Sequence, residues 1–317
     1  MQINGPAAGV ASIHSGMQHA PPALVARQCR PDKGRTAVSY KTILVHLDNS
    51  SRCTPRIAFA AALAKEHGAH VVGLLPTGLY ESTIPAELID PRAGEFIVES
   101  AAYLRRRAEG IVETFRTQMQ AWPSVPFEVR QVDGLTIDAL IDHGRASDLV
   151  VLGQEGGGIR TDTPSYGLVG EVMLGLGRPV LVVPHAGEFE AVPRRIAVAW
   201  NHSREAAVAL NAALPILARA DRVTLIRLAG KGQEAGMPPL LEPHLAGWLR
   251  RHGIPATVDD LVCEIPKPQA LLSRLFDLQV DTLVMGGYGH SRVREMVLGG
   301  MTREILQHMT VPVLMAH

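Results

Sequence analysis

Cysteine, net charge and long apolar runs are all scarce in this sequence, and each scarcity excludes a class of protein. The 317 residues include three cysteines, Cys29, Cys53 and Cys263, with no Cys-x-x-Cys pair, which argues against a disulfide framework and a zinc knuckle. Lys and Arg number 31, as do Asp and Glu, so there is no bulk basic field for a nucleic acid backbone. The apolar runs are far shorter than the ~20 residues that cross a bilayer. We therefore expect a cytoplasmic protein with neither nucleic acid nor a membrane as partner.

The composition is that of a folded chain. With 46% hydrophobic and 20% charged residues, the sequence can bury substantial cores, and its length suits two domains of ~150 residues. Residues 1–40 differ from the rest, because they are rich in Gly, Pro and Ser, show no periodicity and do not resemble a secretory signal. This segment is predicted to be a disordered extension.

From Lys41 onward, short β-branched runs alternate with longer helical patterns, which is typical of a parallel sheet with crossover helices. In the first half, strands are predicted at 42–47, 70–75, 127–132, 148–152 and 180–183, and helices at 55–67, 95–120, 137–145 and 165–176. In the second half, strands are predicted at 195–200, 222–228, 256–262, 282–285 and 311–315, and helices at 205–219, 239–252, 268–278 and 301–308.

The two halves repeat one unit, and the repeat is visible in the letters. Asp148-Leu-Val-Val-Leu-Gly153 matches Asp281-Thr-Leu-Val-Met-Gly286, and in both halves a proline follows the glycine after 26 residues without a gap. Residues 43–50 likewise align with 196–203. The sequence therefore predicts two tandem domains, 41–186 and 193–317, each with a five-stranded parallel sheet. Their short apolar final strands are expected to meet near a pseudo-twofold axis in an intramolecular pseudo-dimer.

A glycine-rich motif follows the fourth strand of the second half. Gly286 and Gly289 precede a nine-residue stretch that ends at Gly299-Gly300, where a helix begins. Glycine lets a backbone approach a ribose or phosphate closely, and a helix N-terminus presents N–H groups to an anion. A polyphosphate would suit such a loop.

This Gly-x2-Gly-x9-Gly pattern, with the helix and the Val-Pro-Val-Leu strand that follow, resembles the ATP-binding branch of the universal stress protein family. The resemblance covers both halves and implies a Rossmann-like fold, similar to that of the adenine nucleotide alpha hydrolases, that binds ATP. It also implies a dimeric form, for which a homodimer is the candidate here.

The resemblance also implies which residues contact the nucleotide. The end of the first strand would lie beside it, the first two glycines and their neighbours would face ribose and α-phosphate, and the helix start would hold the β- and γ-phosphates. The implied set is Ala199, Trp200, Asn201, Met285, Gly286, Tyr288, Gly289, Gly299, Gly300, Met301 and Thr302. Asn201 replaces a usual aspartate that could help to hold Mg²⁺, and Gly300 replaces a usual Ser or Thr.

The first half carries a degenerate form of the same motif. Asp48, Gly153 and Gly156 are retained, but Tyr166 occupies the position of the third glycine and would obstruct a phosphate. Asp48 is open to two interpretations, a nucleotide or Mg²⁺ contact and a group at the start of the following helix. Asn201 has the same ambiguity and favours capping together with Ser203. We expect one ATP per chain, bound in the second half.

Other candidate sites are weaker. The pairs His67/His70 and His244/His252 lack a third metal ligand, and Arg105-Arg106-Arg107 is expected to be a solvated helix face. His290, Arg292 and Arg294 could screen phosphates or be exposed charges, and the thiols of Cys53 and Cys263 are expected to be buried or half-buried.

No nucleophile, base and oxyanion set can be assembled from the sequence. The sequence therefore predicts a nucleotide-responsive regulatory module of the stress response, with at most slow ATP hydrolysis. The alternative is a stress protein that binds no nucleotide and acts through dimerisation and protein partners.

Overall fold

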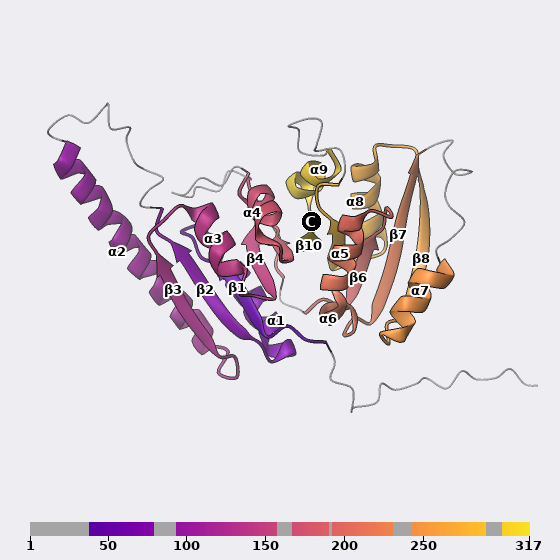
Figure 1. Cartoon of the computed structure of the whole chain (residues 1–317), viewed down its shortest axis with the longest axis horizontal. Coiled ribbons are helices and arrows are strands. Elements are labelled where there is room, and N and C mark those ends of the chain that lie inside the picture. The colour runs from indigo at the N-terminus through magenta and orange to yellow at the C-terminus, as the bar shows by residue number, and fades with distance from the viewer. Residues whose placement is uncertain (1–37, 79–92, 157–166, 190–191, 231–241, 290–299) are drawn as a thin grey trace, which may run out of the picture. The chain divides into compact units, whose positions relative to one another are not determined.

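A computed structural model describes residues 38–78, 93–156, 167–189, 192–230, 242–289 and 300–317 (Figure 1). The described part contains a mixed sheet of ten strands in the order β3-β2-β1-β4-β5-β10-β9-β6-β7-β8. The strands are β1 (Thr42–His46), β2 (His70–Pro76), β3 (Phe127–Val132), β4 (Leu149–Gly153), β5 (Val180–Val183), β6 (Arg195–Ala199), β7 (Arg222–Gly230), β8 (Ala256–Cys263), β9 (Thr282–Gly286) and β10 (Val313–Ala316).

Helices cover both faces of this sheet, as Figure 1 shows. The described helices are α1 (Cys53–His67), α2 (Ala93–Gln120), α3 (Thr136–Gly144), α4 (Leu168–Leu176), α5 (Arg204–Ala212), α6 (Leu214–Leu217), α7 (Glu242–Arg251), α8 (Lys267–Asp277) and α9 (Gly300–His308). The hydrophobic core under α1, α2, α5, α6 and α7 includes Ile43 and Val45, whereas the core under α3, α4, α8 and α9 includes Leu44. This alternation along β1 is the period-2 pattern of a strand that is buried on both faces.

The sheet consists of two five-stranded parallel halves. We call β1–β5 with α1–α4 half 1, and β6–β10 with α5–α9 half 2. Within each half the first strand pairs with the second and the fourth, for example Ile43 with Val71 and with Leu149. The predicted α/β fold class and parallel pairing are confirmed, and the order places the carboxyl ends of the first and fourth strands side by side, where α/β sheets bind ligands.

The final strands of the two halves join the halves into one sheet. β10 pairs with β5 in antiparallel orientation, with Val313 opposite Val182 and Met315 opposite Val180. The expectation that these strands meet is confirmed. Because each pairs with the other, neither is an uncovered edge, and the edges of the ten-stranded sheet are β3 and β8.

Two details of the predicted elements are wrong. The single helix expected at 205–219 is divided into α5 and α6 at Ala213, because Pro215 has no N–H to donate and its ring clashes with the preceding turn. Tyr40, which was assigned to the disordered extension, is only 3% exposed, and its hydroxyl donates a hydrogen bond to the carbonyl of Ala212. Val38 and Ser39 are also described, and residues 1–37 of that extension lie outside the described residues.

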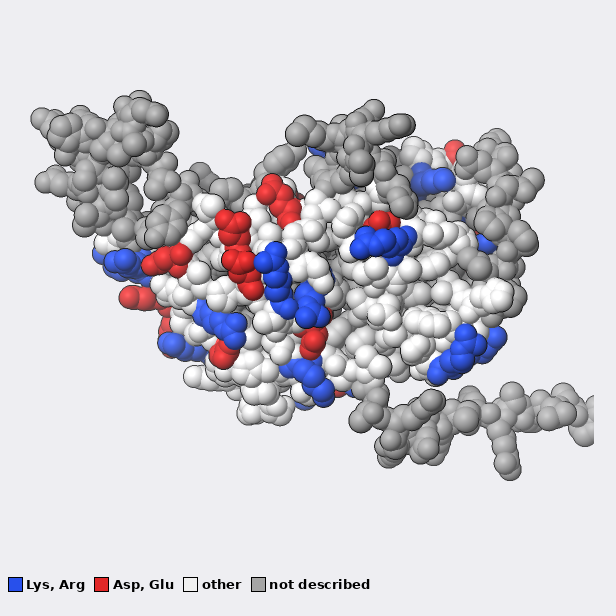
Figure 2. Space-filling model, viewed as in Figure 1, with Lys and Arg blue, Asp and Glu red and all other residues white. Residues whose placement is uncertain are grey.

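The surface of the described residues carries charges of both signs. Figure 2 shows Lys and Arg interspersed with Asp and Glu on the face in view, without a large field of one sign. In the described part of the chain, no helix is long and apolar enough to cross a membrane.

Candidate functional site

Seven of the residues expected to bind nucleotide in half 2 lie at or just after the carboxyl ends of β6 and β9, which are neighbours in the sheet, and Gly300, Met301 and Thr302 begin α9. Ala199 pairs with Met285 at the end of this ladder. The side chain of Met285 is buried in the core. Trp200 is half-buried, and its indole N–H lies 3.3 Å from Nδ1 of exposed His202.

Asn201 and Ser203 begin α5. The Asn201 side-chain oxygen accepts the N–H of Ser203, and the Ser203 hydroxyl in turn accepts the N–H of Ala206 as the helix N-cap. This geometry satisfies backbone donors that the first turn of a helix otherwise leaves without partners. It agrees with the capping interpretation of Asn201.

The glycines after β9 allow close approach of two other elements. A Cβ at Gly286 would lie 2.5 Å from the backbone nitrogen of Ala206, so the start of α5 packs directly on this glycine. A Cβ at Gly287 would overlap the sulfur of Met173, which comes from α4 of half 1. At Gly289 the nearest described atom is a carboxylate oxygen of buried Glu205, 3.5 Å from the Cβ position. Packing therefore explains the first two glycines, and the third lies beside a negative charge.

Tyr288 connects this loop to the start of α9. Its N–H donates to the hydroxyl of Thr302 at 3.1 Å, and both residues are buried. Tyr288 has φ +52°, and His202 in the neighbouring loop has φ +61°. Residues other than glycine rarely adopt this left-handed backbone conformation, and such strain occurs preferentially at functional sites. The loops after β6 and β9 thus each contain a residue in this conformation, whereas the aligned Asn49 and Glu155 of half 1 do not adopt it.

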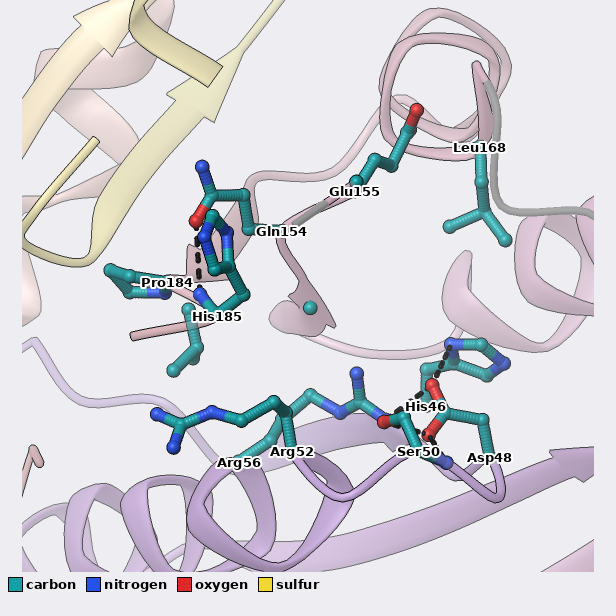
Figure 3. A pocket seen from close by; sticks show the side chains of 13 residues that line it. His46, Asp48, Ser50, Arg52, Arg56, Gln154, Glu155, Leu168, Pro184 and His185 are labelled. Carbon is teal, nitrogen blue, oxygen red and sulfur yellow. Dashed lines mark hydrogen bonds and ion pairs between the residues drawn. The ribbon is translucent and has the colours of Figure 1, made fainter. Parts of the chain in front are cut away.

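The corresponding crevice of half 1 is a pocket, shown in Figure 3. It lies where the loops after β1, β4 and β5 meet the starts of α1 and α4. Its lining is His46, Asp48, Ser50, Arg52, Arg56, Gly153, Gln154, Glu155, Gly156, Leu168, Val183, Pro184 and His185. The three residues expected for a degenerate site, Asp48, Gly153 and Gly156, are therefore brought together.

A buried ion pair occupies the floor of this pocket. Arg56 is 3% exposed, and its guanidinium lies 2.7 Å from a carboxylate oxygen of Asp48, whose other oxygen accepts hydrogen bonds from the N–H and the hydroxyl of Ser50. Burial acts to raise the pKa of Asp48, but Arg56, His46 and Ser50 outweigh it and hold that pKa well below its usual range. Burial also lowers the pKa of neighbouring His46 to about 4. The carboxylate of Asp48 is thus paired with the guanidinium of Arg56.

Arg56 also occupies the space beside the first motif glycine. A Cβ at Gly153 would overlap Nη1 of Arg56. The cavity that remains among the described residues is about 40 Å³, which is room for water-sized groups.

Glu155 occupies the anion position at the start of α4. Its two carboxylate oxygens accept the N–H groups of Gly167, at 2.7 Å, and Val169, at 2.6 Å. Figure 3 shows its side chain directed toward α4 and away from the Arg56–Asp48 pair. Burial raises the pKa of the Glu155 carboxyl, and the two N–H donors act in the opposite direction. The N–H groups that a phosphate would need here are already bound to a carboxylate.

The chain's similarity to known proteins agrees with this architecture. The model of the universal stress protein family matches residues 39–184. Residues 39–184 therefore belong to this family. Universal stress protein Slr1230 of Synechocystis is 23% identical over 291 residues, which cover 86% of this chain and 99% of that protein.

Solved structures show the same fold over both halves. A universal stress protein from Archaeoglobus fulgidus matches with a TM-score of 0.65 and 18% identity, covering 87% of this chain and 97% of that one. A universal stress protein solved in complex with cAMP covers 47% of this chain and all of its own, with 18% identity and a TM-score of 0.32.

The structure also describes the surroundings of several other candidates from the sequence. His67 is buried beside Tyr40, and His70 lies 3.9 Å from Glu128. No group of three or more potential metal ligands exists among the described residues. Cys53 and Cys263 are buried free thiols as expected, and the Arg105–Arg107 run is exposed or partly exposed. Residues 157–166 and 290–299, which include Tyr166, His290, Arg292, Arg294 and Gly299, lie outside the described residues.

Four residues that shape the two sites were not singled out from the sequence: Arg56, Gln154, Glu155 and Glu205. For Arg56 a signal existed, because it is a lone arginine near the start of α1, directly before a run of apolar residues. Gln154 and Glu155 stand between the two glycines of the degenerate motif, and it is the glycines that define this motif. In the sequence, Glu205 is simply an acidic residue in the first turn of a helix. A negative charge is favourable there because of the helix dipole, without any ligand.

Proposed function

We propose that this universal stress protein is a regulatory module that binds an adenine nucleotide, and that ATP is held in half 2. The observation that carries the proposal is the difference between the two helix N-termini. At α4, Glu155 takes the position of the anion, whereas the gap-free repeat places Tyr288 at the aligned position before α9. At Gly300 no described atom lies within 4 Å of a Cβ position. An anion at α9 would therefore not compete with a carboxylate aligned with Glu155.

The proposed contacts follow the family resemblance. Backbone of Gly286 to Gly289 would face the ribose and α-phosphate, and the N–H groups at the start of α9 would hold the β- and γ-phosphates. The hydroxyl of Thr302 accepts the N–H of Tyr288 and keeps its own proton for a phosphate oxygen. Ala199, half-buried Trp200 and Asn201 would lie beside the nucleotide at the end of β6.

Mg²⁺ fits this site as an ion carried by the phosphates. Mg²⁺ is commonly bound through one or two carboxylates together with substrate phosphates. Glu205, whose Oε1 lies 4.0 Å from Nη1 of Arg204, places its other carboxylate oxygen 3.5 Å from the Cβ position of Gly289. Without a cation, the charge of Glu205 would oppose a nearby phosphate. We therefore expect Mg²⁺ to strengthen ATP binding.

The domain limits and the location of the protein also remain proposals. We propose domains at 41–186 and 193–317 within the continuous sheet, and a cytoplasmic location in view of the cysteine content. No catalytic constellation was found in the sequence, so the proposed activity is binding, with at most slow hydrolysis.

A second candidate function is that of a stress protein that binds no nucleotide and acts by forming a homodimer and contacting protein partners. Buried Glu205 favours this candidate, because a carboxylate at the ribose and α-phosphate position repels an anionic ligand.

Two measurements on the purified full chain separate these candidates. Mass spectrometry of the small molecules released by denaturing fresh protein identifies a nucleotide that copurifies. Calorimetric titration with ATP, with and without Mg²⁺, then measures stoichiometry and affinity. We expect one ATP per chain. Two sites per chain would contradict the assignment to half 2, and no binding in either buffer would favour the second candidate.

A further inference from the structure

One side chain of half 1 holds the end of a helix in half 2. Gln154, between the two glycines of the degenerate motif, donates its amide nitrogen to the carbonyls of Leu306, at 2.8 Å, and Gln307, at 3.1 Å. Its side-chain oxygen accepts the N–H of His185 at 2.9 Å, as the dashed line in Figure 3 shows. The residue is 7% exposed. Three hydrogen bonds in a buried place fix the orientation of this amide.

The bonded carbonyls belong to the last turn of α9. Carbonyls in the last turn of a helix have no partner within the helix, so a donor from outside stabilises that end. Helix α9 has nine residues and spans about 13 Å. Its start is the proposed phosphate site, and its end is bound to Gln154. A shift or fraying at the end of so short a helix displaces the N–H groups at its start.

The pseudo-symmetric contact is different in kind. The repeat places Gly287 opposite Gln154 and Met173 opposite Leu306. Gly287 has no side chain to reach α4, and the sulfur of Met173 packs against it instead. Between these aligned positions, the polar contact therefore runs in one direction, from the loop of half 1 to the helix of half 2.

We propose that Gln154 is a positioning residue for the nucleotide site of half 2. The inference rests on the proposed function of that site. In this view the motif loop of half 1 is no longer a phosphate loop: Glu155 closes its own anion position, and Gln154 sets the position of α9. The degenerate motif would then regulate the affinity of the intact one.

The test compares ATP affinity and hydrogen exchange in full-length variants. Gln154→Leu keeps the approximate size and removes the donors, and Gln154→Glu keeps an acceptor for His185 but places an oxygen against two carbonyls. Gln154→Asn is the milder variant, because its shorter amide cannot reach both carbonyls, and it serves if the others fail to fold. Met173→Leu is the control, since it alters the aligned contact without removing a hydrogen bond.

We expect Gln154→Leu to weaken ATP binding about fivefold to tenfold, the loss that corresponds to a typical hydrogen bond or slightly more. Gln154→Glu should weaken it further, and Met173→Leu should change it less than twofold. Without nucleotide, amides of 300–308 should exchange faster in the Gln154 variants than in the wild type.

The outcomes separate this inference from the proposed function. If the wild type binds ATP and the folded Gln154 variants bind it equally well, the inference is wrong, and a lower melting temperature alone would show a merely structural role. If the wild type binds no ATP, the proposed function fails. Hydrogen exchange then tests the contact itself. Faster exchange of the amides of 300–308 in the Gln154 variants supports the proposal that Gln154 stabilises the end of α9, and unchanged exchange overturns it.

Discussion

The two halves of this chain share a strand order but differ in the charged groups at the carboxyl ends of their strands. In half 1 the protein's own side chains occupy the ligand positions, with Arg56 beside the first motif glycine and Glu155 at the helix start. In half 2 the aligned residues are Ala209 and Tyr288, which carry no charge. The comparison teaches that one strand order can carry the protein's own charged groups in one half and uncharged residues at the aligned positions in the other, with the fold unchanged.

The largest expected effect is on the ion pair of half 1. Asp48→Leu should lower the free energy of unfolding by about 3–5 kcal/mol, because it leaves the Arg56 guanidinium buried without its partner. The matched variant Asn201→Leu, at an exposed position, should cost about 1 kcal/mol through a weaker helix start. Urea unfolding of both variants measures the difference. Equal losses of unfolding free energy in the two variants would show that Asp48 and Asn201 contribute equally to stability.

The second effect concerns ATP binding by half 2. Gly299→Tyr would imitate Tyr166 of half 1, and the loss of two charge-assisted hydrogen bonds at ~1.5–3 kcal/mol each should weaken ATP binding by a factor of order 10² or more. Gly156→Ala in half 1 is the control. Since Gly156 has φ +84°, alanine there strains the backbone but should leave ATP affinity unchanged. Calorimetric titration decides, and normal ATP binding by Gly299→Tyr would place the site elsewhere.

The third effect is a pH dependence that belongs to half 1. The folded-state pKa of His46 is about 4, below its ordinary value of 6.5, so between these pH values the unfolded chain binds the proton and the folded protein does not. His46 therefore makes stability rise with pH across this window, by about 3 kcal/mol in total. The aligned residue of half 2 is Ala199, which cannot titrate.

His46→Gln provides the measurement. The gain in unfolding free energy from pH 4 to pH 6.5 should be smaller in this variant than in the wild type. Part of the gain should persist, because burial also lowers the pKa of His67 to about 4. An unchanged pH profile would mean that the pKa of His46 is the same in the folded protein and in the unfolded chain.

The smallest effect is at the start of α4. Glu155→Ala removes the acceptor for two backbone N–H groups and should lower the unfolding free energy by about 1–2 kcal/mol. Glu171→Ala, an exposed change in the first turn of the same helix, should cost less than about 0.5 kcal/mol. Because Arg56 still fills the pocket, Glu155→Ala should not bind a second ATP. A stoichiometry of two for this variant would show that Glu155 alone closes half 1.

The fold was predictable from the sequence because its signals are local and repeated. Period-2 runs and the gap-free match from Gly153 to Pro179 with Gly286 to Pro312 placed the strands and indicated that the final ones would meet. The division between α5 and α6 could also have been predicted from Pro215, whose effect on a helix is local.

The candidate sites were less predictable, because they depend on contacts between residues distant in the chain. The bonds from Gln154 to Leu306 and Gln307 join different halves, and no local pattern marks them. Tyr166 suggested that half 1 is closed, but among the described residues Arg56 and Glu155 fill it. The burial of Glu205 beside Gly289 also follows from packing of α5 against β9, which the letters alone do not reveal.

The pairing of β5 with β10 has a consequence for biosynthesis. Among the described strands β10 is the last to be translated, and it completes the parallel ladder with β9 as well as covering β5. Half 1 can therefore fold on the ribosome while the backbone of β5 is still open to any other strand. Throughout that interval a nascent chain is exposed to pairing with β5 or β10 of a neighbour, so exchange of β10 between chains is the misassembly to which this architecture is most vulnerable.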